Sequence, residues 1–211
     1  MLVIKVSKTN KDEVLQKAID LLKKGGIIAY PAETFYGIGA KFDMEKSLER
    51  IYEIKKRPKM KAMPLIIGDR RLLSVVAASV TDIAIYLMEK FWPGPLTLIF
   101  QAKEGLSKYI AGDTNKVAIR IPGKSFALDL AKIIDFPITA TSANLSGMPP
   151  AKDARTVMRY FEDDMDLLVD SGLTPGGLPS TIVDVTEVKI TIIREGAVSK
   201  ESLREFLNGS I

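Results

Sequence analysis

The sequence has neither cysteine nor histidine. The absence of cysteine excludes disulfides, thiolate metal sites and cysteine nucleophiles, and it is compatible with an intracellular protein. The absence of histidine removes the most common general base and the most common metal ligand. A serine or cysteine hydrolase is therefore not expected. Any catalysis must depend on carboxylates, hydroxyls, cations or a metal ion that arrives with a substrate.

Long apolar runs are also absent. The apolar start of the chain, Met1 to Val6, is too short for a signal peptide, and no stretch reaches the length that spans a membrane. We therefore expect a soluble, cytoplasmic protein. The 211 residues suffice to bury a sizeable core, and no repeat or linker divides them, so we expect one domain over residues 1–211. The net charge of +4 favours anionic partners only mildly.

Hydrophobic patterning alternates between strands and helices. Strands are predicted at residues 27–30, 64–67, 96–101, 117–121, 138–141, 167–169, 182–185 and 189–194. Helices are predicted after Asn10, from Asp43 to Lys55, after Thr81, and at residues 126–133, 154–161 and 200–207. The alternation indicates an α/β fold. Several late strands have no helix between them, so we expect one sheet with parallel and antiparallel pairs, flanked by helices.

Two nucleotide-binding motifs are present only in part. Gly123-Lys124-Ser125 resembles the end of a P-loop, but Ala118 stands where the first glycine is required. Gly37-Ile38-Gly39 resembles a dinucleotide-binding fingerprint, but Phe42 occupies the position of the third glycine. Neither a P-loop fold nor a Rossmann fold is supported.

A basic run follows the second predicted helix. Five of the seven residues from Lys55 to Lys61 are cationic, and Pro58 ends the helix. Because the helix dipole favours cations at this end, a solvated helix terminus is the plainest interpretation. A surface for RNA and a cradle for a triphosphate are the alternatives.

Small polar side chains gather in two further segments. The segment from Thr139 to Gly147 continues a predicted strand into hydroxyl and amide residues, which let a ligand approach the backbone but also form ordinary turns. The segment from Tyr30 to Gly39 places Glu33 and Thr34 between a strand and a predicted glycine turn.

Two arginines lie near the ends of apolar strands. A guanidinium group is unfavourable there without an anionic partner, so Arg120 and Arg194 should bind either a ligand or an Asp or Glu of the chain.

Several motifs occur in one order along nearly the whole chain: PAETFYGIGA, KKRP followed by PLI, FWPGPLTLIF, VAIRIP, TATSANLSG, STIVD and IIREG. In this order they resemble the YrdC-like family of threonylcarbamoyl-AMP synthases, in its short, single-domain form. The resemblance implies a twisted, mixed α/β fold whose concave, positively charged face binds ATP, L-threonine and bicarbonate.

The resemblance also implies a reaction. The enzyme would be a nucleotidyltransferase that forms threonylcarbamoyl-adenylate and pyrophosphate, with Mg²⁺ carried by ATP and no metal ion held by the protein. This is the first step of N6-threonylcarbamoyladenosine formation in tRNA. Transfer RNA or double-stranded RNA and the downstream threonylcarbamoyl transferase complex are candidate partners.

Two other functions stay open. One is an RNA-binding or ribosome-assembly factor that uses the same basic face without catalysis, although an aromatic content of 7% offers few stacking platforms for single strands. The other is an enzyme of the same fold that acts on another amino acid or nucleotide.

The resemblance assigns two groups of site residues. The group around ATP consists of Lys55, Arg57, Lys61, Ser142, Asn144 and Arg194. Lys55 and Arg57 of this group are expected to be catalytic. The group around threonine consists of Thr34, Arg120, Ala140 and Ser180. Arg120 would be the bidentate partner of the threonine carboxylate, and Ala140 would contribute through its backbone.

The chain departs from the family pattern near the expected threonine site. Gly68 stands where many relatives have a histidine, and Lys124 follows Ile-Pro-Gly where a histidine is frequent. The stretch that contains Lys61 is two residues longer than in many relatives. None of these changes affects Lys55, Arg57, Ser142 or Asn144.

Overall fold

The computed structural model describes residues 1–57, 61–187 and 189–208, which form two β-sheets. The first sheet has the strand order β1 (Leu2–Lys5), β9 (Leu167–Asp170), β2 (Ile28–Pro31), β3 (Tyr36–Gly39) and β8 (Thr141–Ser142). The second has the order β11 (Thr191–Arg194), β10 (Thr181–Asp184), β5 (Leu96–Gln101), β6 (Lys116–Arg120), β4 (Leu65–Ile66) and β7 (Ile138–Thr139).

Both sheets combine parallel and antiparallel pairs. In the first sheet β9 runs parallel to β1 and β2, and β3 runs antiparallel to β2 and β8. In the second, β5 pairs parallel with β10 and antiparallel with β6. The predicted α/β class with mixed strand directions is confirmed. The single sheet that we expected is instead two sheets.

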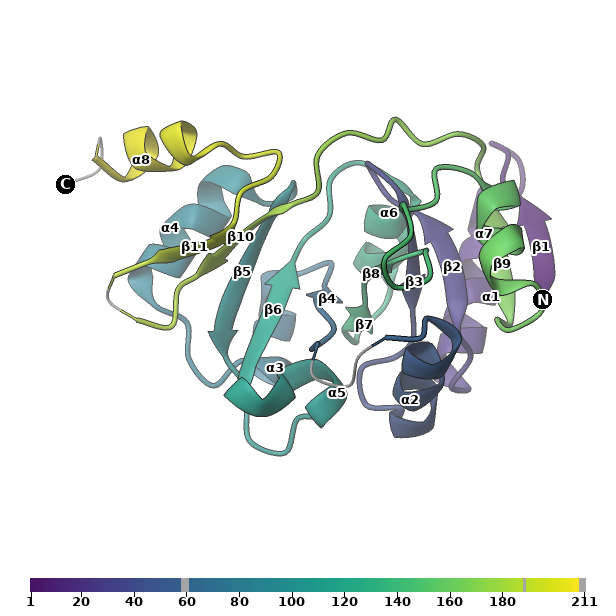
Figure 1. Ribbon diagram of the computed structural model, residues 1–211, viewed down its shortest axis with the longest axis horizontal. Coiled ribbons are helices and arrows are strands. Elements are labelled where there is room, and N and C mark those ends of the chain that lie inside the picture. Colours follow the sequence, from purple (N-terminus) through teal and green to yellow (C-terminus); the bar gives the residue numbers. More distant parts are fainter. Residues whose placement is uncertain (58–60, 188, 209–211) are drawn as a thin grey trace.

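Helices cover both ends of the molecule (Figure 1). α1 (Lys11–Lys23), α6 (Phe126–Ile133) and α7 (Ala154–Phe161) contact strands of the first sheet. α4 (Asp82–Phe91) and α8 (Lys200–Asn208) lie together beside the second sheet, where the Phe206 ring stacks on Tyr86 at 4.4 Å between centroids. α2 (Glu45–Ile54), the short helices α3 (Leu73–Val76) and α5 (Lys108–Ala111), and two 3₁₀ turns at Arg70–Leu72 and Gly112–Thr114 complete the chain. No helix in the described ranges is long and apolar enough to cross a membrane.

The bounds of several elements agree with the sequence predictions, and others differ. β5, α6 and α7 have the predicted bounds, and Thr81 caps α4 by accepting the Ala84 N–H at 3.3 Å. Asp43 does not cap α2, because Met44 is the residue before its first turn. The predicted glycine turn is the strand β3, and β1 was not predicted.

The predicted strand at residues 138–141 is split between the two sheets. Its first half, β7, pairs with β4 of the second sheet, whereas its second half, β8, pairs with β3 of the first sheet. Ala140 lies at the change of sheet, and its N–H donates to the Pro64 carbonyl at 2.9 Å. The two sheets therefore meet at Ala140.

One hydrophobic core joins the two sheets. Ile38 of the first sheet and Leu65, Leu98 and Ile119 of the second are fully buried in the same cluster. A second cluster lies under α1 and α6 and contains Leu22 and Leu130. Because buried apolar area is the main favourable term in folding, the shared cluster fixes how the sheets sit against each other.

One charged side chain is buried among these apolar residues. Lys55, directly after α2, is only 2% exposed and makes no ion pair with any described carboxylate. Burial, together with the nearby Arg57 charge, lowers the pKa of the Lys55 ammonium to about 7.

Helix α6 packs on Gly68 so closely that no side chain fits there. A methyl group at this position would lie 2.0 Å from the Ala131 carbonyl oxygen. We expect Gly68→Ala to destabilise the fold by about 1–3 kcal/mol, since backbone would have to move, and to lower the melting temperature by roughly 2–4 °C per kcal/mol. Gly123→Ala, whose methyl meets Glu33 Cγ at 3.4 Å, is the matched control. Equal melting temperatures for the two variants would contradict this packing.

Lys55 should make stability depend on pH. Below about pH 7 the lysine is charged in the folded and unfolded chain, so the folded state bears the full cost of burying the charge. Between about 7 and its ordinary value of 10.5, only the unfolded chain keeps the proton. The free energy of unfolding therefore rises with pH across this range.

Lys55→Met removes this titration. We expect the melting temperature of the wild type minus that of Lys55→Met to become more positive from about pH 6.5 to about pH 9.5. Thermal denaturation of both proteins across this range measures the difference. A difference that is constant or falls with pH would show that the lysine does not titrate as inferred.

Candidate functional site

A cavity of about 900 Å³ lies where the two sheets meet. Its walls come from both sheets: β2, β3 and β8 of the first, and β4, β5, β6, β10 and β11 of the second. Most of the predicted site residues line it, namely Thr34, Arg57, Arg120, Ala140, Ser142, Ser180 and Arg194. Segments separated by up to 160 residues in sequence (34 to 194) are thereby brought to one place.

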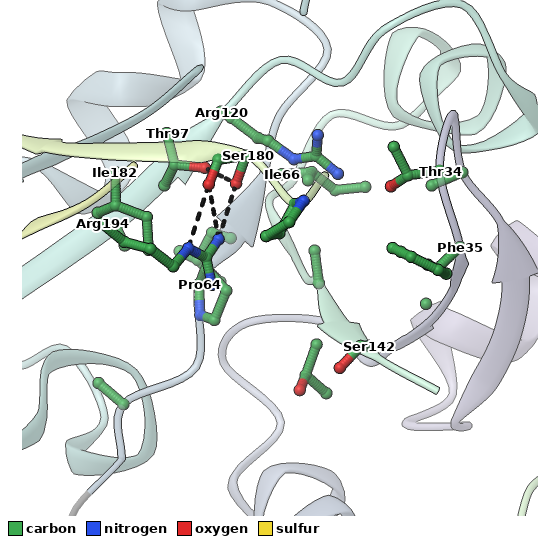
Figure 2. A pocket seen from close by; sticks show the side chains of 18 of the residues that line it. Thr34, Phe35, Pro64, Ile66, Thr97, Arg120, Ser142, Ser180, Ile182 and Arg194 are labelled. Atoms are coloured by element: carbon green, nitrogen blue, oxygen red, sulfur yellow. Dashed lines mark hydrogen bonds between the residues drawn. The ribbon is translucent and has the colours of Figure 1, made fainter. Parts of the chain in front are cut away.

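Arg194 and Ser180 form one wall of the cavity (Figure 2). The Arg194 guanidinium donates to the Ser180 carbonyl oxygen from Nε at 3.2 Å and from Nη2 at 2.7 Å. The Ser180 hydroxyl lies 2.8 Å from Thr97 Oγ1. Thr34 and Phe35 lie across the cavity from this group. The guanidinium is thus fixed in direction before any ligand is bound.

A buried hydroxyl holds the backbone that follows Arg194. Thr181 Oγ1 accepts the N–H groups of Gly196 at 2.9 Å and Val198 at 3.1 Å, and donates to the Val198 carbonyl. Gly196 approaches so closely that a Cβ would lie 2.1 Å from the Pro179 carbonyl oxygen. The glycine of the IIREG motif is therefore required by the approach of this turn to Ser180.

Arg120 is paired with a carboxylate that was not predicted as a site residue. Arg120 Nη1 donates to Glu33 Oε1, and both side chains are largely buried. The other oxygen, Glu33 Oε2, is buried and has no hydrogen-bond partner within the described ranges. The sequence offered a signal, since Glu33 adjoins Thr34 and Arg120 required an anion.

Arg194 has no such partner among the carboxylates that the structure describes. Arg194 is exposed, but partial desolvation in the cavity and the nearby Arg120 charge lower its pKa from the ordinary value, because both disfavour the charged form. An anion bound in the cavity would relieve both effects. Burial also raises the pKa of Tyr30, another residue of the wall, and keeps its hydroxyl neutral as a donor to the Thr139 carbonyl at 3.0 Å.

Arg57 reaches the cavity from the segment after α2. Its guanidinium donates to the backbone carbonyls of Lys61 at 3.0 Å and Ala62 at 2.8 Å, and lies 5.7 Å from the centre of the Tyr52 ring. Nη1 also lies 3.4 Å from Thr141 Oγ1. These contacts hold a third guanidinium at the cavity wall.

Three predicted site residues do not line the cavity. The Lys55 ammonium donates to the backbone carbonyls of Ser142 and Asn144. The Asn144 amide donates to the carbonyls of Leu145 at 3.0 Å and Met148 at 2.6 Å, and its Oδ1 accepts the Ser142 hydroxyl. Lys61 is exposed, and Lys59 of the same basic run lies outside the described residues. The roles assigned to these residues stay predictions.

An ion pair that we did not predict lies elsewhere on the cavity wall. Lys116 Nζ is 2.8 Å from Asp184 Oδ2. Burial alone would raise the pKa of Asp184, but hydrogen bonds from Lys116 and Thr186 lower it below its ordinary value, so the Asp184 carboxyl is ionised. Alternation along β6 could have found this residue, because Lys116, Ala118 and Arg120 share one face.

The site suits an anion with several charges. Three guanidinium groups from different segments face one cavity, and only Glu33 pairs with any of them among the described residues. The described residues contain no group of three or more His, Cys, Asp or Glu side chains that could hold a metal ion. Positioned cations and hydroxyls are thus the chemical resources of the site.

Comparison with known sequences identifies relatives along nearly the whole chain. Threonylcarbamoyl-AMP synthase of Pyrococcus abyssi is 32% identical over 206 residues, which are 98% of this chain and 61% of that protein. Threonylcarbamoyl-AMP synthase of Bacillus subtilis is 35% identical over 196 residues, or 92% of this chain and 56% of that protein. The chain therefore spans about 60% of the length of these curated relatives.

Solved structures have the same fold. P. abyssi Sua5 complexed with L-threonine has a TM-score of 0.92 at 32% identity, over 98% of this chain and 61% of that one. E. coli YciO has a TM-score of 0.81 at 25% identity, over 93% of this chain and 95% of that one.

A family model matches residues 20–196, the range that carries the site, and its description reads "Telomere recombination". The match covers every motif on which the resemblance was based, from PAETFYGIGA at residues 31–40 to IIREG at residues 192–196. The resemblance is thereby confirmed, and the chain belongs to the Sua5/YciO/YrdC family.

Proposed function

We propose that this chain catalyses the formation of threonylcarbamoyl-AMP and pyrophosphate from L-threonine, bicarbonate and ATP. The observation that carries the proposal is the convergence of Arg57, Arg120 and Arg194 on one cavity. Two curated relatives named Threonylcarbamoyl-AMP synthase support it, as does a P. abyssi relative whose crystal structure contains L-threonine.

The charge of the cavity supports binding of a triphosphate. Arg57 and Arg194 make hydrogen bonds mainly to carbonyl oxygens and have no carboxylate partner in the described part of the chain. Their charges are therefore available to a ligand, and guanidinium groups bind phosphate oxygens in a planar, bidentate manner. Ser142 lines the same cavity, and its hydroxyl can bind a phosphate oxygen when it releases Asn144 Oδ1. We assign these three residues, with Asn144 and Lys61, to ATP.

The arrangement around Arg120 supports binding of an amino acid. Glu33 occupies only one nitrogen, Nη1, so the remaining donors of Arg120 can bind an α-carboxylate. Thr34 and Ser180 place hydroxyls on opposite sides of the same cavity, where they can meet the substrate's polar atoms. We assign Thr34, Arg120, Ser180 and the backbone of Ala140 to threonine.

In this mechanism the enzyme supplies position and charge and forms no covalent intermediate. Bicarbonate takes up a proton and loses water to give carbon dioxide. The threonine amine adds to the carbon dioxide, and the nitrogen releases a proton to give a carbamate, so the two protons balance. A carbamate oxygen then attacks the α-phosphorus, the bond from that phosphorus to the oxygen bridging the α- and β-phosphates breaks, and pyrophosphate leaves. Arg57 and Arg194 stabilise the charge that develops on phosphate oxygens, and Mg²⁺ arrives with ATP.

The product would serve a later acyl transfer. Threonylcarbamoyl-AMP is a mixed anhydride, so its threonylcarbamoyl group can pass to an amine such as N6 of a tRNA adenosine. We propose the transferase that carries out this step as the downstream partner.

The reaction can be tested by its requirements. We expect the chain to convert ATP to pyrophosphate only when both L-threonine and bicarbonate are present, because the attacking oxygen belongs to their carbamate. Pyrophosphate release and the adenylate product are measured with each substrate omitted in turn, and with L-serine in place of threonine. Turnover that is independent of amino acid and bicarbonate would contradict the proposal.

Two arginine variants should affect different substrates. Arg57→Ala should lower kcat/KM for ATP by roughly a hundredfold, the effect of removing one donor from a developing negative charge. Arg120→Lys should mainly raise KM for threonine, by about tenfold or more, since lysine cannot form the bidentate pair.

Steady-state kinetics with each substrate varied separately test this division, and each variant serves as the control for the other. If both variants changed the two KM values alike, the assignment of the two ends of the site would be wrong.

A further inference from the structure

We propose that Lys55 is a positioning residue, which holds the turn Ser142–Met148 in the form that presents Ser142 to the cavity and does not itself touch the nucleotide. The proposal rests on the proposed function of the site. It differs from the sequence prediction, in which the Lys55 ammonium contacts the phosphates directly.

Lys55 makes three hydrogen bonds to this turn. Its ammonium donates to the carbonyl oxygen of Ser142 and, at 2.6 Å, to that of Asn144. Its own backbone carbonyl accepts the Ser146 N–H at 2.9 Å. One residue at the end of α2 therefore binds the turn at residues 142, 144 and 146.

The ammonium lies outside the described lining of the cavity. Lys55 is 2% exposed and is absent from the described lining of the cavity, whereas Ser142 forms part of that lining. A buried charge of this kind is unfavourable unless hydrogen bonds compensate for lost water, and the two carbonyls supply them. A phosphate could reach this ammonium only if the turn first released it.

The two hydrogen bonds from Lys55 to carbonyl oxygens affect the electrostatic potential of an anion-binding site. Carbonyl oxygens carry partial negative charge, so carbonyls turned toward the cavity would repel a phosphate. Lys55 binds the carbonyls of Ser142 and Asn144 on its own side of the turn, which leaves the Ser142 hydroxyl at the cavity wall. The lysine thus acts on the nucleotide through Ser142.

The turn also depends on bonds of its own. Asn144 donates to Met148 O, Met148 N–H donates to Leu145 O at 2.9 Å, and the Ser142 hydroxyl donates to the Asn144 amide oxygen. Without the ammonium these bonds remain, so loss of Lys55 should loosen the turn without unfolding the surrounding sheets.

The test compares Lys55→Met with Lys56→Met and Arg57→Ala in the 211-residue chain. Hydrogen exchange is measured without nucleotide. In Lys55→Met we expect the amides of residues 143–148 to exchange roughly tenfold faster or more, because the hydrogen bond from Lys55 Nζ to each carbonyl is lost. Lys56 is exposed, so Lys56→Met removes a charge from the same run and should exchange like the wild type. Arg57→Ala should lose ATP turnover with normal exchange in this turn.

Kinetics separate a positioning role from a general loss of stability. Lys55→Met should raise KM for ATP and lower kcat, each by about tenfold, while KM for threonine stays within about twofold because Thr34 and Arg120 are untouched.

Unchanged exchange at residues 143–148 together with lost ATP turnover would overturn the proposal, because the lysine would then contact the nucleotide. Faster exchange in all elements, or an equal rise in both KM values, would also overturn it. If the wild type turns over no ATP, the proposed function fails, and exchange in the free protein still decides the role of Lys55.

Discussion

The site depends on the change of sheet at Ala140. A continuous strand at residues 138–141 would have joined all strands into one surface, and the cavity would not exist. Instead β7 and β8 belong to different sheets, and the Pro64 carbonyl fixes the residue between them. The apolar cluster shared by the sheets then packs the two halves against each other. The residues proposed to contact the substrates come from both sides of this junction.

Positively charged side chains that are unfavourable in the free protein lie near the same junction. Lys55, which is buried, and Arg194, which is partly desolvated, both have lowered pKa values, because desolvation and a neighbouring arginine disfavour their charged forms. Neither has a carboxylate partner among the described residues, and Glu33 pairs with Arg120 alone. The folded protein thus carries unneutralised positive charge that an anionic substrate would compensate. Charge that is unfavourable in the free protein would thus become favourable once the proposed anionic substrate is bound.

Local sequence patterns predicted most helices and strands. Where the structure differs from the prediction, contacts between segments distant in sequence are the reason. The bounds of β5, α6 and α7 followed from hydrophobic period and capping residues. Gly37 and Gly39 favour a turn in the sequence, yet they lie in β3, where these glycines make room for the Tyr30 ring to pack on the strand. The break at Ala140 left no local signal, because either half of the segment is an acceptable strand.

The same contrast between local sequence signals and long-range contacts applies to the site. The family motifs predicted that Arg57, Arg120, Ser142, Ser180 and Arg194 would gather, and they line one cavity. Motifs could not indicate that the Lys55 side chain turns inward to the backbone. Glu33, next to Thr34, and Lys116, which shares a face of β6 with Arg120, had signals in the sequence that the motif assignment did not use. The Lys116–Asp184 pair makes the charge of the cavity uneven. Arg57 and Arg194 have no carboxylate partner among the described residues, whereas the charge of Lys116 is neutralised by Asp184. A ligand that is negatively charged at one end should therefore bind in one orientation, with its charged end toward the unpaired guanidinium groups.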